Sequence, residues 1–401
     1  MAASTVRAPG IKPEPVPVKV KVVLVGEPDL WYALNDADPD FAYLFKVLVD
    51  FDDACCRRDP VGIGLYARVI ARVARDEQLL PFSATAVGAL VEHGAREAAA
   101  PDKLTARFGR VMDAAREAAF LARARGVRIV DRDDVDQALV AAQRRADLPG
   151  RKFRDGVARG QIRIRTRGEA VGEVNGLAVV QAGLVAQGFP TRITATAGPG
   201  TAGTVHVERE AELSGNIHTK GFLILRGLLR DLLPGWPLAF DASITHEQSY
   251  GGIDGDSASG AEFCCLLSAL TRLPVRQSIA MTGAVDQHGN ILQIGAVNEK
   301  IEGFFDVCAV QGLTNGPPGV IVPRSNAGDL QLRREVVHAC RAGRFAVWAV
   351  DRIEEAVELL FGVPAGAPTA EGRYPEGTVL HRAAERAERL WRLSQPPREG
   401  R

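Results

Sequence analysis

The 401-residue chain lacks several features that would place a protein in a membrane, secreted or nucleic-acid-binding class. It has no apolar run near the roughly 18–20 residues that a membrane helix requires, so we expect no membrane partner. Its first residues carry prolines where a signal peptide needs an apolar stretch, and we therefore expect a cytoplasmic protein. Basic and acidic residues number 49 each, so the chain has no overall positive charge that would attract nucleic acid. We therefore do not expect nucleic acid as a partner.

The chain is also poor in cysteine, with six residues that include two adjacent pairs, at 55–56 and 264–265. Neighbouring cysteines do not form a disulfide easily, and no C-x-x-C spacing indicates zinc. The remaining cysteines, Cys308 and Cys340, stand alone. We expect free thiols in a reducing compartment and no metal site.

No G-x-x-x-x-G-K-[ST] phosphate loop occurs anywhere in the sequence. The glycine-rich stretch "GPGTAGT" at 198–204 has no lysine after its last glycine, and we interpret it as a turn between strands. No predicted strand ends in the Asp-Glu pair of a magnesium-binding box. We therefore expect that this chain requires no cofactor, and that ATP and magnesium would enter only through a complete ATPase module.

What is present in the first part of the chain is a short apolar region followed by helical periodicity. Residues 1–17 are proline-rich and predicted to be disordered. The β-branched run "VKVKVVLVGEP" at 18–28 predicts a buried strand, and residues 40–52 predict a helix tip and a second short strand. Between residues 60 and 145, apolar residues recur at three- and four-residue spacing, which predicts a compact unit of four helices.

The second part of the chain alternates predicted strands and helices. Polar, glycine-interrupted residues 146–170 are interpreted as a linker, and residues 171–365 as an α/β (α+β) domain. Residues 366–401 are predicted to hold a last charged helix and a disordered end.

The stretch "SYGGIDGDSASGAEFCCLLSAL" at 249–270 places Ser257 in a glycine-rich turn before a helix, where a nucleophile can be displayed. A serine hydroxyl attacks only when a base removes its proton. A Ser-His-Asp triad is weakly supported, because Ser259 stands where the G-x-S-x-G elbow requires glycine. Any histidine base would have to be one of seven: His93, His206, His218, His246, His288, His338 and His381.

A lysine base is the second possibility, since burial pulls the pKa of a lysine toward neutrality. Lys300 lies in the first turns of a predicted apolar helix, just after the flexible stretch "IGAVN" at 294–298. The alternative is a surface lysine paired with Glu299 or Glu302, and spacing alone favours this at least equally.

Several motifs, in order and at matching spacing, resemble the proteolytic domain of the Lon proteases. These are "YGGIDGDSAS", "MTGAVDQHGNILQIGAVNEK" and the 43-residue step from Ser257 to Lys300. The "GDSAS" form is closer to the archaeal, LonB-type branch than to the "GPSAG" form. The resemblance implies that Ser257 is the nucleophile and Lys300 the general base of a dyad, with Thr282 and Asp254 in supporting roles.

The first part of the chain resembles the last strands and the helical lid of a Lon-type AAA+ module. The residues that carry this resemblance are "VKVVLVGEP", "DPDFAYLFKVLVDFD" and the helices ending "VDRDDVDQAL", and residues 18–145 are interpreted as a truncated module. Arg107, in "KLTARFGR", falls where such lids carry a nucleotide-sensing arginine. Without a phosphate loop a single sensor makes no site, so we expect Arg107 to be structural.

Together these observations predict a Lon-like serine endopeptidase that acts on unfolded polypeptides. The resemblance also implies a homo-oligomer, a hexameric ring that encloses its active sites. The alternative is a non-catalytic adaptor that assembles with full-length Lon-type subunits, although an adaptor has no need of Ser257 and Lys300 together.

Overall fold

The computed structural model describes most of the chain, in six stretches: residues 16–53, 56–182, 185–200, 204–234, 237–312 and 317–395. It forms two compact units, residues 1–52 and 53–401, and each is described by itself. The ends that the sequence predicts to be disordered lie almost entirely outside the described residues.

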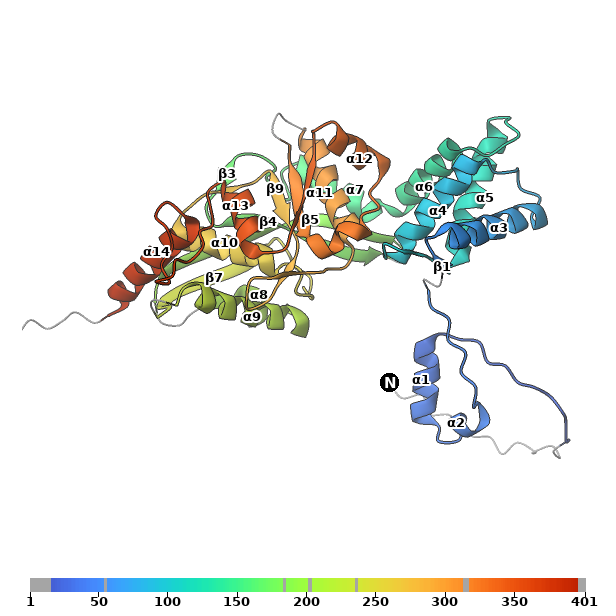
Figure 1. The fold of residues 1–401 in the computed structure, drawn as a ribbon, viewed down its shortest axis with the longest axis horizontal. Coiled ribbons are helices and arrows are strands. Elements are labelled where there is room, and N and C mark those ends of the chain that lie inside the picture. The colour runs from blue at the N-terminus through green and yellow to red at the C-terminus, as the bar shows by residue number, and fades with distance from the viewer. Residues whose placement is uncertain are drawn as a thin grey trace, which may run out of the picture. The chain divides into compact units, whose positions relative to one another are not determined.

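The first unit contains two helices and, within residues 16–52, no strand (Figure 1). Helix α1 spans Pro28–Ala37, and α2 spans Phe41–Leu44, at the predicted helix tip. The two strands predicted on either side are wrong: the run at 18–28 has no regular structure before α1, and Val25 is 95% exposed. A β-branched run becomes a strand only when another strand completes its hydrogen bonds, and these residues find none here.

Four helices follow at the predicted places: α3 (Pro60–Asp76), α4 (Ala84–Ala98), α5 (Phe108–Ala124) and α6 (Arg132–Ala146). Their apolar stripes meet in one core, in which Tyr66, Leu90 and Val111 are fully buried. The prediction of a compact helical unit is therefore confirmed.

Side-chain caps define where these helices begin. The carboxylate of Asp59 accepts a hydrogen bond from the Gly62 amide at the start of α3, and the hydroxyl of Ser83 accepts one from Ala86 at the start of α4. Helix α5 begins only at Phe108, because β2 (Lys103–Leu104) first pairs with β1 (Cys56–Arg57).

The predicted linker is folded rather than extended. It contains α7 (Leu148–Ala158), and Val157 of this helix packs with Ile164 and with Val307 of the later helix α11 (Val297–Gln311). Proline at the start of α7 and polar residues along it hid this helix from the sequence pattern.

A mixed seven-stranded sheet forms the C-terminal domain, in the order β13-β12-β9-β4-β5-β7-β6. Strands β13, β12, β9 and β4 run parallel, β5 is antiparallel to both its neighbours, and β6 is parallel to β7. The strands are β4 (Glu173–Ala182), β5 (Val185–Pro199), β6 (Thr204–His206), β7 (Phe240–Glu247), β9 (Ile279–Met281), β12 (Gly319–Pro323) and β13 (Ala346–Val350). Two short ladders join β3 (Glu169–Ala170) to β8 (Val275–Arg276) and β10 (Ala284–Val285) to β11 (Ile291–Leu292). This mixed sheet with helices confirms the predicted α/β (α+β) class.

Helices cover both faces of this sheet, because alternate residues of its strands enter two different cores. In β12, Ile321 joins one core while Val320 and Val322 join the other. The first core contains residues of α9 (Asn216–Leu232), α10 (Ser259–Thr271), α13 (Ile353–Phe361) and α14 (Val379–Ser394). The second contains residues of α11 (Val297–Gln311) and α12 (Arg334–Arg341). Two short helical turns, α8 (Val207–Glu210) and η1 (Arg324–Asp329), complete the domain.

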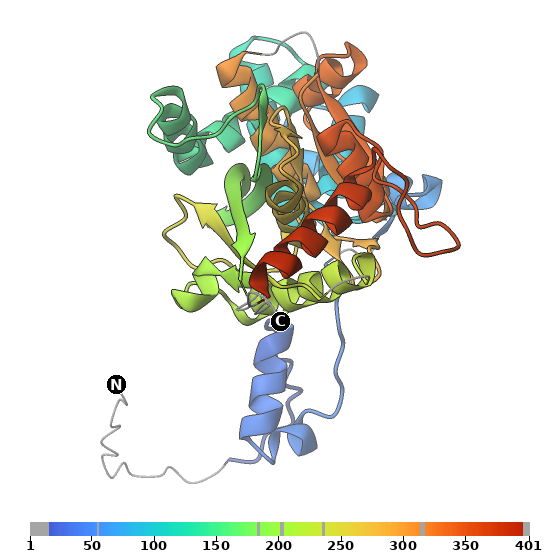
Figure 2. The ribbon, with the colours of Figure 1, turned by 90° about the vertical axis from the view of Figure 1, so that its left-hand side faces the viewer.

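The last helix belongs to this domain, although the sequence suggested a separate terminal segment. Leu380, Ala383 and Leu390 of α14 are buried in the first core. Figure 2 shows α14 as the long red helix nearest the viewer. Its many charged residues occupy the opposite face of the helix, and they masked its apolar stripe.

The cysteines that the structure describes agree with free thiols. Cys264, Cys265 and Cys308 are unpaired and buried, and burial raises the pKa of each thiol. The side chains of the pair at 55–56 lie outside the described residues.

An arginine joins the helical domain to the C-terminal domain. Arg96 of α4 donates hydrogen bonds to Glu302 at 2.7 and 2.9 Å and to Glu299 at 3.0 Å, both on α11. The side chain of Glu302 is 5% exposed. These contacts tie α4 to the first turns of α11.

We expect the substitution Arg96→Met to lower the free energy of unfolding by about 2–3 kcal/mol, because Glu302 would stay buried after losing one of its cations. The loss falls short of a fully orphaned charge because the Arg333 amide still donates to Glu302 at 2.8 Å. Arg72→Met, which breaks an exposed pair with Asp76, should cost less than about 0.5 kcal/mol. Urea titration compares the variants, and equal losses in both would contradict this account.

Candidate active site

Ser257 lies in the connection between β7 and α10, in the turn just before the helix begins at Ser259. Gly255 has a φ of 92°, a backbone conformation that residues other than glycine adopt only with strain. The carboxylate of Asp254 accepts hydrogen bonds from the amides of Gly255, Ile217 and His218, at 2.8, 3.2 and 3.3 Å. These bonds fasten the turn to the start of α9, and they hold the pKa of Asp254 below its ordinary value.

The structure brings Lys300 to Ser257. Lys300 Nζ lies 2.9 Å from Ser257 Oγ and 3.4 Å from Thr282 Oγ1. Thr282 donates its own hydroxyl proton to the backbone carbonyl of Ser257 at 3.2 Å, and the Gly283 amide donates to the same oxygen at 2.8 Å. Three residues far apart in the sequence therefore share one hydrogen-bonded cluster.

Lys300 is 3% exposed, next to the buried residues Ile301 and Phe304 of its own helix. Burial lowers the pKa of Lys300 from 10.5 to about 8, and the negative charge of Asp256 opposes this shift. A substantial fraction of the lysine is therefore neutral near pH 8, and a neutral amine can accept a proton.

The surface-lysine alternative does not hold, because both neighbouring glutamates have other partners. Glu299 and Glu302 bond Arg96, whereas the Lys300 amine points to Ser257. The geometry thus favours the second of the base arrangements that the sequence left open.

Arg107 lies on the helical domain, at the start of α5, and forms an ion pair with Asp53. Its side chain is 53% exposed. Asp53 gives Arg107 an ion-pair partner, and the expectation that Arg107 is structural rather than nucleotide-sensing stays a prediction.

Three family models, each describing one domain, match successive parts of the chain. They are described as "LonB-like, AAA domain" for residues 1–52, "Archaeal LonB, AAA+ ATPase LID domain" for residues 81–145, and "Lon protease (S16) C-terminal proteolytic domain" for residues 249–362. The last match contains the Ser257 turn, Thr282 and Lys300. The chain belongs to the Lon protease family.

Curated members of the Lon family show how much of the chain is shared. A "Putative Lon protease homolog" of Escherichia coli (strain K12) is 36% identical over 87% of this chain and 59% of its own length. A "Putative Lon protease homolog" of Haemophilus influenzae is 47% identical over 50% of this chain and 34% of its own length. An "Archaeal Lon protease" of Pyrococcus abyssi is 27% identical over 87% of this chain and 33% of its own length. The chain thus spans between 33% and 59% of the length of these Lon relatives. The family resemblance that the motifs indicated is confirmed.

In the part of this Lon-family chain that the structure describes, no helix is long and apolar enough to cross a membrane.

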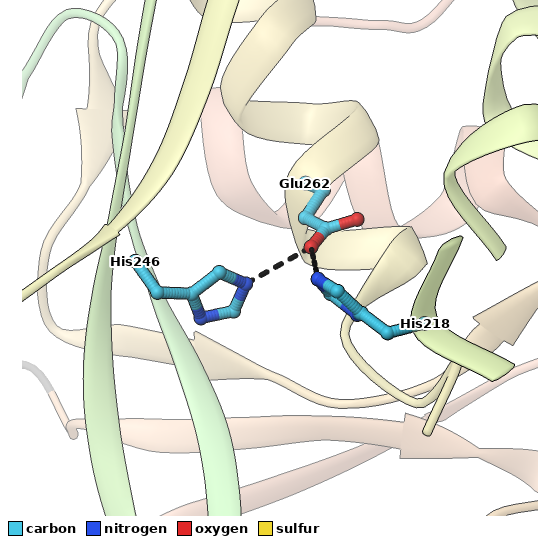
Figure 3. Close-up of side chains that lie close together, drawn as sticks. All are labelled: His218, His246 and Glu262. Carbon is cyan, nitrogen blue, oxygen red and sulfur yellow. Dashed lines mark hydrogen bonds and ion pairs between the residues drawn. The ribbon is translucent and has the colours of Figure 1, made fainter. Parts of the chain in front are cut away.

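A second group of buried polar residues, which no sequence motif revealed, lies beside the Ser257 turn. His218, His246 and Glu262 come together there from three different elements (Figure 3). Nothing in their spacing along the chain points to a common site, since only folding places α9, β7 and α10 side by side.

Proposed function

We propose that this chain is a serine-type endopeptidase in which Ser257 is the nucleophile and Lys300 the general base. The observation that supports the proposal most strongly is the 2.9 Å distance between Lys300 Nζ and Ser257 Oγ in a buried environment. That distance allows direct proton transfer. The same contact argues against a purely structural adaptor, which would gain nothing from burying a lysine beside a serine.

The proposed reaction begins with neutral Lys300, which accepts the hydroxyl proton of Ser257 as Oγ attacks the carbonyl carbon of the peptide bond. A new C–O bond forms and the carbonyl becomes a tetrahedral oxyanion. Lys300 then returns the proton to the leaving nitrogen as the C–N bond breaks. In the second half-reaction Lys300 takes a proton from water as the water oxygen attacks the acyl carbon. The ester bond to Ser257 Oγ then breaks, and Lys300 returns the proton to that oxygen.

The first residues of α10 would stabilise the oxyanion. Ser257 lies two residues before this 13-residue helix, whose N-terminal end carries partial positive charge from its backbone amides. Thr282 would position the amine, because it accepts a hydrogen bond from Lys300 while donating to the Ser257 carbonyl. Asp254 would hold the turn in place through its three amide contacts.

We further propose that the substrates are unfolded polypeptides and that the compartment is the cytoplasm. We also propose that the chain assembles into a homo-oligomeric ring, which is hexameric if it follows the family resemblance. The 401 residues hold no phosphate loop, so the purified chain should cleave casein at the same rate with and without ATP and magnesium. Cleavage is measured by the release of fluorescent fragments, and the mass of the assembly by light scattering. Stimulation by ATP would contradict the cofactor proposal, and an active monomer would contradict the ring.

A further inference from the structure

We propose that His218, His246 and Glu262 form a binding site for one divalent transition-metal ion of the zinc type. The three side chains come from α9, β7 and α10, and their exposed fractions are 2%, 4% and 1%. Figure 3 shows the two imidazole rings converging on the same carboxylate oxygen. This site is distinct from Ser257 and Lys300, and it does not depend on the proposed peptidase activity.

The spacing of the potential ligand atoms suits a single ion. Glu262 Oε1 lies 2.9 Å from His246 Nε2 and 3.5 Å from His218 Nε2, and the ligand atoms are all within 4.8 Å of one another. Around a tetrahedral Zn²⁺ with bonds of about 2.0–2.1 Å, neighbouring ligand atoms are roughly 3.3 Å apart. The two observed contacts bracket that separation, so small rotations of the three side chains would complete the site.

The hydrogen bond of His218 points to a cation between the ring and the carboxylate. His218 Nδ1 lies 3.1 Å from the backbone carbonyl of Gly255, an oxygen that can only accept, so Nδ1 carries the hydrogen. A neutral ring then directs the lone pair of Nε2 toward Glu262 Oε1. Two lone pairs that face each other in a buried site repel, unless a metal ion or a second proton lies between them.

This arrangement is the one that metal-binding histidines commonly show. One ring nitrogen faces the metal, and the other donates to a backbone carbonyl or to another oxygen that fixes the orientation of the ring. Gly255 O supplies that second contact for His218, and Thr191 Oγ1, at 3.5 Å from Nδ1, is placed to supply it for His246.

Two imidazole nitrogens and one carboxylate oxygen favour zinc or a similar transition metal over calcium or magnesium, which prefer oxygen ligands alone. Three protein ligands leave the fourth position of a tetrahedral ion for water. Because all three ligands are buried, we expect the ion to bind during folding, before the connection between β7 and α10 closes over it.

A metal ion here would position the Ser257 turn. It would link α9, β7 and α10, and through His218 it would fix the Gly255 carbonyl, two residues before the serine. We therefore expect metal-free protein to have a lower kcat with little change in KM, since substrate contacts are unaffected while the nucleophile is less well oriented.

The test uses the full-length, tag-free chain, unfolded in a chelator and refolded with or without added Zn²⁺. Elemental analysis after gel filtration should find about one zinc per chain, and zinc should raise the melting temperature. Refolding with Co²⁺ should give the visible absorption of a tetrahedral nitrogen–oxygen site.

The variants His246→Gln and Glu262→Gln should bind zinc at least about 100-fold more weakly, because each loses a ligand. His288→Gln is the control, since that histidine is exposed and lies near the exposed carboxylate of Asp231, and it should keep the ion. Wild-type chain that holds no zinc or cobalt and gains no thermal stability would overturn the proposal, whether or not the variants fold. In that case a proton bridges the cluster. A wild-type chain that binds the metal but shows no peptidase activity would instead contradict the proposed function and leave the metal site standing.

Discussion

The substitutions Ser257→Ala and Lys300→Met are each expected to lower kcat/KM for peptide hydrolysis by roughly 10⁴-fold or more. Alanine removes the nucleophilic oxygen. Methionine fills much of the same volume but cannot accept the proton of Ser257 Oγ, which lies 2.9 Å from the amine that the substitution removes. The two losses should not add in the double variant, since both residues serve one step.

Lys300→Met should at the same time stabilise the protein. The pKa of Lys300 is about 8 in the fold against an ordinary 10.5, so keeping this lysine protonated in the fold at pH 7 costs up to about 3 kcal/mol. The unfolded chain binds more protons than the folded chain between these two values, so wild-type stability rises with pH through this window. The gain in free energy of unfolding from methionine should therefore be largest below pH 8 and fade toward pH 10.5. The hydrogen bonds to Ser257 and Thr282 that the variant loses reduce this gain.

Matched controls separate chemistry from folding. Ser249→Ala changes a serine of the same connection, and Lys220→Met changes an exposed lysine of α9. Both should retain wild-type kinetics and stability, as measured by peptide cleavage and urea titration. Near-wild-type activity in either dyad variant, or a strong loss in either control, would show that the assignment of the dyad is wrong.

The second large effect is on the pH dependence of catalysis. Because only the neutral amine of Lys300 accepts a proton, kcat/KM should fall about tenfold for each pH unit below about 8 and level off above it. The negative charge of Asp256 raises the pKa of Lys300. Asp256→Asn should therefore move the acidic limb of the profile to lower pH.

The profile is measured with a short fluorogenic peptide under conditions where the protein stays folded. Asp231→Asn, at an exposed carboxylate on α9, serves as the matched control and should leave the limb where it is in the wild type. A flat profile between pH 6 and 9 would contradict a lysine base, and a shift to higher pH in Asp256→Asn would contradict the sign of the charge effect.

The fold was predictable where local pattern is enough. Residues 60–146 show helical periodicity, and Ser83 and Asp131 cap their helices as short polar residues do at helix starts. The Ser257 turn was also visible, because glycines and a following apolar helix mark it. These elements depend on neighbours that are close in the sequence.

The remaining features depend on partners that the sequence does not name. Val25 and its neighbours have strong strand propensity but no strand beside them, so propensity failed. Lys300 could have paired with Glu299, and that alternative was removed by Arg96 on another domain, which binds the glutamate, and by Ser257, which lies next to the amine. His218 and Glu262 are 44 positions apart, and no motif joins them.

The central claim is that a buried neutral lysine activates Ser257 for covalent attack, and the direct measurement is the site of the acyl group during turnover. An activated peptide ester is added at pH 8, the reaction is stopped in acid, and peptide mass mapping locates the adduct. We expect acylation of Ser257 in the wild type and none in Lys300→Met. Acylation at another residue, or equal acylation of Ser257 without the lysine, would contradict it.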